Sequence, residues 1–301
     1  LQIAALRPPE LGAVISVCST DDRYADDVHY MGGCLLGDNL SWASTMFSYN
    51  SLPPDPEIVG DRWRDLWLQR LEADRPWLVP WLRHQHRDDY WRHGSICEDH
   101  ARVEVPVMAV SGWADGYSNA VLRLLRHLTG PRLGIIGPWS HKYPHLGVPG
   151  PAIGFLQESV RWWDQWLKGI ETGIADEPVL RAWMLHSMPP SASYRQRHGH
   201  WVSESSWPSP RIEEQRFGFG HHRLLRGAPS EDDELSIRSP LTVGLFAGKW
   251  CSYSAPPDLP HDQREEDGGA LVFTSDPLPE SIEVLGAPTV DLRVCADRPV
   301  A

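Results

Sequence analysis

Two polar residues directly after two predicted strands could together move a proton. Asp115 lies in the segment VSGWADGY, after an apolar run at residues 105–111, and His141 lies in IIGPWSH, after a second run at residues 132–137. Parallel neighbours in a sheet lie about 5 Å apart and end at the same edge, so the loops that carry Asp115 and His141 should meet. An Asp in that position can accept a hydrogen bond from the His ring, and the His can then take a proton from a serine.

Asp115 and His141, each taken alone, have a simpler interpretation. An Asp after a strand is commonly part of a turn or a helix cap, and a His in a loop is usually solvated. His145 is a second candidate base, and its loop position gives no reason to prefer it. Ser118 is a candidate nucleophile, since it fits a loose G-x-S-x-A pattern, but it directly precedes a predicted helix, where serine is a favoured N-cap.

The elements that would position Asp115 and His141 form a parallel α/β unit. Residues 13–18, 105–111 and 132–137 are short, apolar runs bounded by glycine or polar residues, as in buried strands. Residues 119–129 have apolar positions at helical spacing before Gly130, and a further helix is predicted over residues 155–168. The order strand, helix, strand predicts a parallel crossover.

Three regions follow from the changes in sequence pattern. Residues 1–23 and 103–175 form a predicted α/β core, whose N-terminal part is missing, and residues 24–102 a Trp-rich helical insertion. We expect the insertion to cap the site, because segments at the carboxyl ends of parallel strands lie where ligands bind; the alternative is a cover over the sheet edge. Residues 176–301 predict an all-β, jelly-roll-like domain with short strands at 179–185, 241–246, 270–274 and 289–294, and the sequence leaves open whether this domain continues beyond Ala301.

Composition restricts the partners of the protein. The chain has 301 residues and a net charge of −12, which argues against a nucleic-acid partner and suits a small neutral or cationic substrate. No run is long and apolar enough to predict a membrane span. The five cysteines are scattered without a C-x-x-C pair, which favours a reducing, cytoplasmic setting over disulfides or a zinc site. The sequence leaves open whether the protein is a monomer or a homo-oligomer.

The start of the chain suggests a longer protein. LQIAAL has no initiator Met and no helix cap, so we expect the chain to begin within a helix of a larger polypeptide. A signal peptide upstream of Leu1 therefore stays open.

The pair SGWADGY and IIGPWSH resembles the CocE/NonD hydrolases, which are related to X-Pro dipeptidyl-peptidases and α-amino-acid ester hydrolases. The opening LQIAALRPPELGAVISVCSTDD resembles the helix and strand that follow the nucleophile of that family, the Trp-rich insertion resembles its cap, and GALVFTSDPLPESIEVLGAPTVDLRV resembles its jelly-roll domain. The resemblance implies an α/β-hydrolase core with a helical cap and a β domain. It also implies hydrolysis of an ester, amide or X-Pro dipeptidyl bond through an acyl-enzyme, without a metal or organic cofactor.

The resemblance also implies roles for individual residues. Asp115 would be the acid and His141 the base of a catalytic triad, and the nucleophilic serine would lie in a G-x-S-x-x-G turn upstream of Leu1. We therefore expect the isolated chain to be inactive or nearly so. Tyr117 would face the substrate.

Other aromatic and acidic residues have two interpretations each. Trp113 and Trp139 either line the pocket or pack the loops. Asp26 and Asp27 either bind a substrate amine, as the related peptidases and ester hydrolases require, or belong to a solvated, helix-capping acidic loop.

Three functional hypotheses result: a serine hydrolase, an inactive relative that serves as a binding module through its β domain, and a metal-assisted hydrolase. The third needs clustered ligands, and the 14 histidines show no such spacing.

Overall fold

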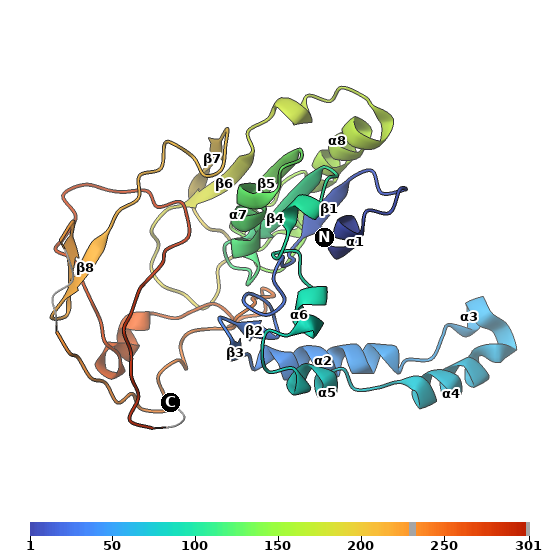
Figure 1. The fold of residues 1–301 in the computed structure, drawn as a ribbon, viewed down its shortest axis with the longest axis horizontal. Helices are drawn as coiled ribbons and strands as arrows, with labels where there is room; N and C mark the ends of the chain where they lie inside the picture. Colours follow the sequence, from blue (N-terminus) through green and yellow to red (C-terminus); the bar gives the residue numbers. More distant parts are fainter. Residues whose placement is uncertain (229–232, 299–301) are drawn as a thin grey trace.

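A five-stranded mixed sheet forms the core of the computed structural model, which describes residues 1–228 and 233–298 (Figure 1). The strands lie in the order β1-β4-β5-β6-β7; the first four are parallel and β7 is antiparallel to β6. Their bounds are β1 Val14–Val17, β4 Val107–Gly112, β5 Arg132–Gly137, β6 Leu180–Leu185 and β7 Gly199–Glu204. The predicted parallel crossover from β4 to β5 is confirmed.

Helices cover both faces of this sheet, and alternating residues of β4 meet different helices. Val107 and Ala109 belong to an apolar cluster with α1 (Gln2–Leu6) and α7 (Ser118–His127), whereas Met108 and Val110 belong to a cluster with α8 (Phe155–Lys168). A strand buried on both faces reads as a continuous apolar run, because successive side chains point to opposite sides. Short 3₁₀ helices occur at Gly60–Arg62, His100–Arg102, Pro144–Leu146, Ile174–Asp176 and Gln263–Gly269.

The insertion between β1 and β4 is helical, as predicted. Its elements are β2 Tyr30–Met31, β3 Cys34–Leu35, α2 Asp38–Asn50, α3 Pro56–Val59, α4 Trp63–Ala73, α5 Leu78–Arg83 and α6 Asp89–His93. In Figure 1, α2 to α5 run away from the sheet as an arm. Tyr30, Ala43, Trp81 and Trp91 form a small apolar cluster within the insertion. Whether this segment caps a bound substrate stays a prediction.

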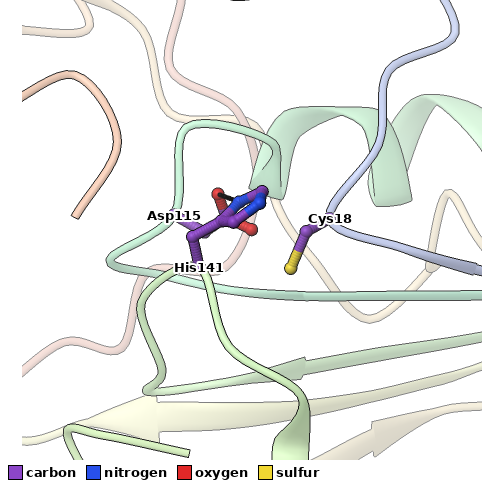
Figure 2. A group of neighbouring side chains, drawn as sticks. All are labelled: Cys18, Asp115 and His141. Carbon is purple, nitrogen blue, oxygen red and sulfur yellow. Dashed lines mark hydrogen bonds and ion pairs between the residues drawn. The ribbon is translucent and has the colours of Figure 1, made fainter. Parts of the chain in front are cut away.

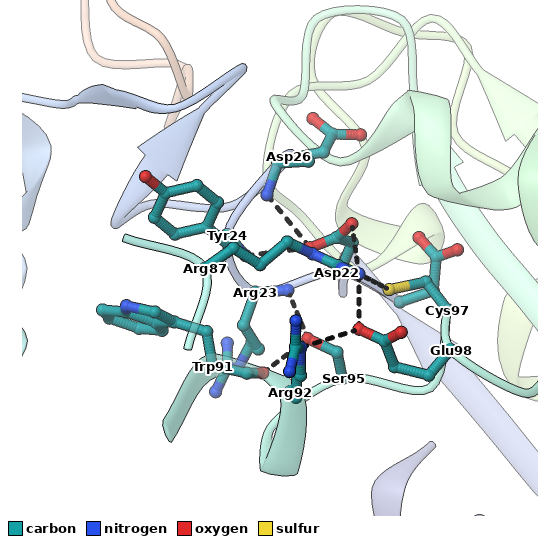
Figure 3. A network of polar contacts seen from close by, with 12 residues as sticks. Asp22, Arg23, Tyr24, Asp26, Arg87, Trp91, Arg92, Ser95, Cys97 and Glu98 are labelled. Atoms are coloured by element: carbon teal, nitrogen blue, oxygen red, sulfur yellow. Dashed lines mark hydrogen bonds and ion pairs between the residues drawn. The ribbon is translucent and has the colours of Figure 1, made fainter. Parts of the chain in front are cut away.

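Charged and polar contacts tie α6 to the loop that follows β1 (Figure 3). Arg87 lies 2.6 Å from the Glu98 carboxylate and 3.9 Å from that of Asp22. The Ser95 hydroxyl donates to the carbonyl of Trp91 at 2.7 Å and accepts from the backbone N–H of Arg23 at 2.9 Å. The insertion therefore has a fixed attachment next to the carboxyl end of β1.

The C-terminal region differs from the predicted pattern of strands. The strand predicted at residues 179–185 forms as β6, but it pairs with β5 inside the main sheet. Beyond β7, the described residues form one hairpin, β8 (Phe217–Gly220) with β9 (Arg223–Arg226), and a single bridge from Arg223 to Thr274. The strands predicted at 241–246 and 289–294 do not form, because exposed residues there find no neighbouring strand to pair with. None of the helices in the described ranges combines the length and apolar character of a membrane crossing.

A buried cluster of charges fastens α7 to the segment after β1. Arg123 donates twice to the Asp21 carboxylate, at 3.0 and 2.5 Å, and is also paired with Asp26. His100 contacts the second Asp21 oxygen at 3.0 Å. Burial opposes ionisation of Asp21, but the hydrogen bonds from His100 and Arg123 outweigh it and lower its pKa. Burial raises the pKa of Asp26 against the effect of Arg123.

We predict that Arg123→Met lowers the free energy of unfolding at pH 7 by about 3 kcal/mol, because it leaves two buried carboxylates without their cation. Urea unfolding measures this. Arg126→Met is the matched control, since Arg126 is exposed on the same helix and should change stability by less than about 0.5 kcal/mol.

The difference in the free energy of unfolding between wild type and Arg123→Met also depends on pH. The contribution of Asp21 is fully present above its ordinary pKa of 3.8 and is lost as the pH falls through its lowered folded value. The difference between wild type and Arg123→Met should therefore shrink below about pH 4. A difference that stays constant down to pH 3 would contradict this account of the cluster.

Candidate active site

Asp115 and His141 meet at the carboxyl edge of the sheet. Asp115 lies in the turn after β4 and His141 in the loop after β5, and their strands end in register at Gly112 and Gly137. The His141 Nδ1 atom is 3.1 Å from Asp115 Oδ1 (Figure 2). The Asp115 side chain is fully buried, whereas 30% of the His141 side chain is exposed. With the proton on Nδ1, the second ring nitrogen is left to accept a proton from a reacting group.

Asp115 is fixed from several sides. The Ser111 hydroxyl donates to Asp115 Oδ2 at 2.8 Å, and the Cys251 thiol lies 3.5 Å from Oδ1. Burial opposes ionisation of Asp115, but the hydrogen bonds from His141, Cys18 and Ser111 outweigh it and hold its pKa below the ordinary value. The carboxylate is therefore ionised at neutral pH and held in one position.

The two loops approach so closely that glycine is required between them. The backbone N–H of Ala114 donates to the Trp139 carbonyl at 3.1 Å, and that of Trp113 to the Gly137 carbonyl at 2.9 Å. A Cβ atom at Gly112 would overlap the backbone of Trp139. Any side chain at Gly112 would therefore push the loop of His141 away from Asp115.

Tyr117 lies beside the imidazole, and its position depends on the acidic loop. Its ring centroid is 5.7 Å from that of His141, and its hydroxyl donates to Asp27 Oδ1 at 2.9 Å. Asp27 is fully buried, and its other oxygen accepts from Arg23 at 2.9 Å. Burial, followed by the charge of Asp27, raises the pKa of the Tyr117 hydroxyl, which stays protonated as a donor.

The contacts of the other predicted site residues distinguish between their two interpretations. Trp139 is fully buried, with its indole N–H donated to Pro151 at 2.7 Å, and Trp113 donates to Trp183 at 2.7 Å. Both contacts favour loop packing over a substrate wall. Asp26 and Asp27 are buried and paired with arginines, so the solvated-loop alternative is wrong for them.

The rival nucleophile is Ser118, and the rival base is His145. Ser118 is the first residue of α7, whose N-cap is Tyr117, and no side chain caps that helix end. Its predicted role as the cap is therefore wrong by one position, a common uncertainty at helix ends. The His145 ring stacks on Phe155, with 6.3 Å between the centroids, and its buried Nδ1 atom has no hydrogen-bond partner among the described residues.

Two groups near the pair were not expected from the sequence. The segment Trp250–Ser254 covers it: the Ser252 carbonyl accepts from the His141 backbone at 2.7 Å, the Tyr253 ring lies 5.2 Å from the imidazole, and Trp250 packs on Tyr117. Cys18, directly after β1, lies beside Asp115 and His141 (Figure 2). The segment Trp250–Ser254 has no helical or strand periodicity, so only its cluster of large side chains could have indicated that it lies at the site.

We predict that Gly112→Ala destabilises the protein by about 3 kcal/mol, because the added methyl group overlaps backbone that cannot rotate away. Thermal or urea unfolding measures the effect. Gly37→Ala is the matched control, since a Cβ there meets no atom within 4 Å. Equal losses in the two variants would show that the approach of the two loops is not tight.

Family models match both halves of the chain. Residues 1–143 match X-Pro dipeptidyl-peptidase (S15 family), and residues 173–301 match the X-Pro dipeptidyl-peptidase C-terminal non-catalytic domain. A Mycobacterium bovis protein named as a serine esterase is 28% identical over 224 residues, which are 68% of this chain and 32% of that protein. A Bacillus cereus protein named as a Xaa-Pro dipeptidyl-peptidase is 25% identical over 167 residues, or 54% of this chain and 24% of that protein.

Solved structures show the same fold. A CocE/NonD family hydrolase from Staphylococcus aureus has a TM-score of 0.56 at 17% identity and covers 74% of this chain and 35% of its own. An α-amino acid ester hydrolase has a TM-score of 0.50 at 16% identity, over 79% of this chain and 42% of its own. This chain spans about a third of the length of the Mycobacterium bovis protein. The fold is that of an α/β-hydrolase core followed by a C-terminal domain of the β type.

Proposed function

We propose that this chain, whose two halves match models of X-Pro dipeptidyl-peptidases, supplies the acid and the base of a serine hydrolase. Asp115 is the acid and His141 the base. The observation that carries the proposal is the 3.1 Å contact between a fully buried carboxylate and a partly exposed imidazole at the carboxyl edge of a parallel sheet.

In the proposed reaction, the second ring nitrogen of His141 takes the proton of a serine hydroxyl while the serine oxygen attacks the substrate carbonyl. Asp115 stabilises the resulting imidazolium and fixes its orientation. His141 then gives the proton to the leaving alcohol or amine as the bond to it breaks, which leaves an acyl-enzyme. Water, deprotonated by His141, attacks the acyl-enzyme and restores the serine.

The nucleophile in this proposal lies outside residues 1–301. Among the residues that the structure describes, Asp115 is the hydrogen-bonding partner of the His141 ring, and no serine hydroxyl takes the second position. The greater length of the relatives leaves room for the missing serine and its oxyanion hole.

The proposed substrates are small esters or amides, including short X-Pro peptides. Tyr117 and Tyr253 flank the imidazole and offer apolar surface to an acyl group. A dipeptidyl substrate would in addition need a carboxylate for its α-amine. For Asp26 or Asp27 to serve, the substrate amine would have to replace Arg123 or Arg23, so we place esters first.

We predict that His141→Gln and Asp115→Asn each lower kcat/KM of the full-length protein about 10³–10⁴-fold, because the serine loses its base or the base loses its orientation. Release of p-nitrophenol from an ester and of p-nitroaniline from an X-Pro anilide measures the rates. His93→Gln, an exposed histidine on α6, is the control and should keep its full rate. Wild-type rates in His141→Gln would overturn the proposal, and a loss in His145→Gln alone would move the base to that residue.

We predict further that residues 1–301 alone show no turnover of either substrate and are not labelled by a fluorophosphonate, since the activated serine is absent. Labelling of the full-length protein under the same conditions is the positive control. A labelled serine within residues 1–301, located by mass spectrometry, would contradict the placement of the nucleophile.

A further inference from the structure

A third side chain faces the Asp115–His141 pair and plays no part in the proposed reaction. Cys18 follows β1 directly and has a positive φ of 49°, which is uncommon for a residue other than glycine. Its backbone N–H donates to the Val110 carbonyl at 2.8 Å, so the thiol is held at the end of the neighbouring strand β4. Figure 2 shows the sulfur beside the pair.

We propose that Cys18, Asp115 and His141 form a binding site for a divalent cation of the zinc class, and that occupancy of this site blocks proton transfer by His141. The Sγ atom, a carboxylate oxygen and a ring nitrogen all lie within 4.8 Å of one another. Zinc binds sulfur, nitrogen and oxygen at about 2.0–2.3 Å, so modest side-chain rotations bring all three into contact with one ion.

The chemistry of the three ligands selects a thiophilic ion. Thiolate, imidazole and carboxylate together suit zinc or cadmium, whereas magnesium and calcium prefer oxygen alone. Three protein ligands leave a fourth position for water. A second thiol, Cys251, lies 3.5 Å from Asp115 Oδ1 and is buried next to the same carboxylate.

The charge at the site also favours a cation, because the fully buried Asp115 carboxylate lies beside the Cys18 thiol. A divalent ion bound between them deprotonates the thiol directly. The partly exposed His141 ring gives the ion access from solvent.

Cadmium titration of the chelator-treated chain tests the site without any activity measurement. We expect one equivalent of Cd²⁺ to produce the ultraviolet charge-transfer absorbance of a cadmium–thiolate bond, and Zn²⁺ to reverse it by competition. Cys18→Ser should abolish this absorbance. Cys34→Ser, which removes an exposed thiol on β3, is the matched control and should keep it.

A second variant keeps the test valid if the loss of Cys18 disturbs folding. His141→Gln retains all five thiols, and we expect it to weaken cadmium binding at least tenfold while the circular dichroism spectrum stays unchanged. An absorbance that survives in Cys18→Ser, or that disappears in Cys34→Ser, would overturn the site, as would unchanged affinity in His141→Gln.

The blocking effect rests on the proposed function and has its own measurement. In the full-length protein, Zn²⁺ should inhibit ester hydrolysis, a chelator should restore it, and Cys18→Ser should need at least tenfold more Zn²⁺ for half inhibition. Cadmium binding without any hydrolysis would refute the proposed function and leave the site standing. Hydrolysis that zinc does not affect would refute the blocking role.

Discussion

The register between β4 and β5 is the constraint on which the rest of the site depends. Six residue pairs, from Val107 with Arg132 to Gly112 with Gly137, bring both strands to an end at the same level. The chain then leaves the sheet in two loops that share backbone hydrogen bonds, and only a glycine at position 112 allows their approach. A shift of the register by one residue would turn every buried side chain of β4 to the opposite face of the sheet, and it would separate Asp115 from His141.

Buried carboxylates surround this edge, and each is compensated by a cation or by hydrogen-bond donors. Asp21 and Asp26 share Arg123, Asp27 accepts from Arg23 and Tyr117, and Asp115 accepts from Ser111 and the imidazole. Because an unpaired buried charge is costly, these pairings restrict which segments can come together. The acidic loop after β1 thereby places the Tyr117 ring beside His141, although none of its carboxylates touches the imidazole.

The sequence predicts the parts of the structure that depend on local patterns. Short apolar runs indicate β1, β4 and β5, helical spacing indicates α7 and α8, and the crossover rule then brings Asp115 and His141 to one edge. The place of β6 was not predictable in this way, because the change to proline-rich sequence near residue 176 precedes a strand that returns to the main sheet. Cys18 and the segment Trp250–Ser254 reach the site through long-range packing, which periodicity along the chain does not encode.

The position of the segment Trp250–Ser254 shows how the C-terminal part of the chain contributes to the site. It lies in the part that matches a C-terminal domain described as non-catalytic, yet its backbone and rings contact His141 and Tyr117, and the Cys251 thiol contacts Asp115. A domain that supplies no reacting group can still fix the imidazole, exclude water and shape the surface that an acyl group meets. Since the Ser252 carbonyl holds the His141 backbone, docking of this region and the orientation of His141 are coupled. Substitutions far along the sequence can therefore change the geometry of the pair without changing either of its residues.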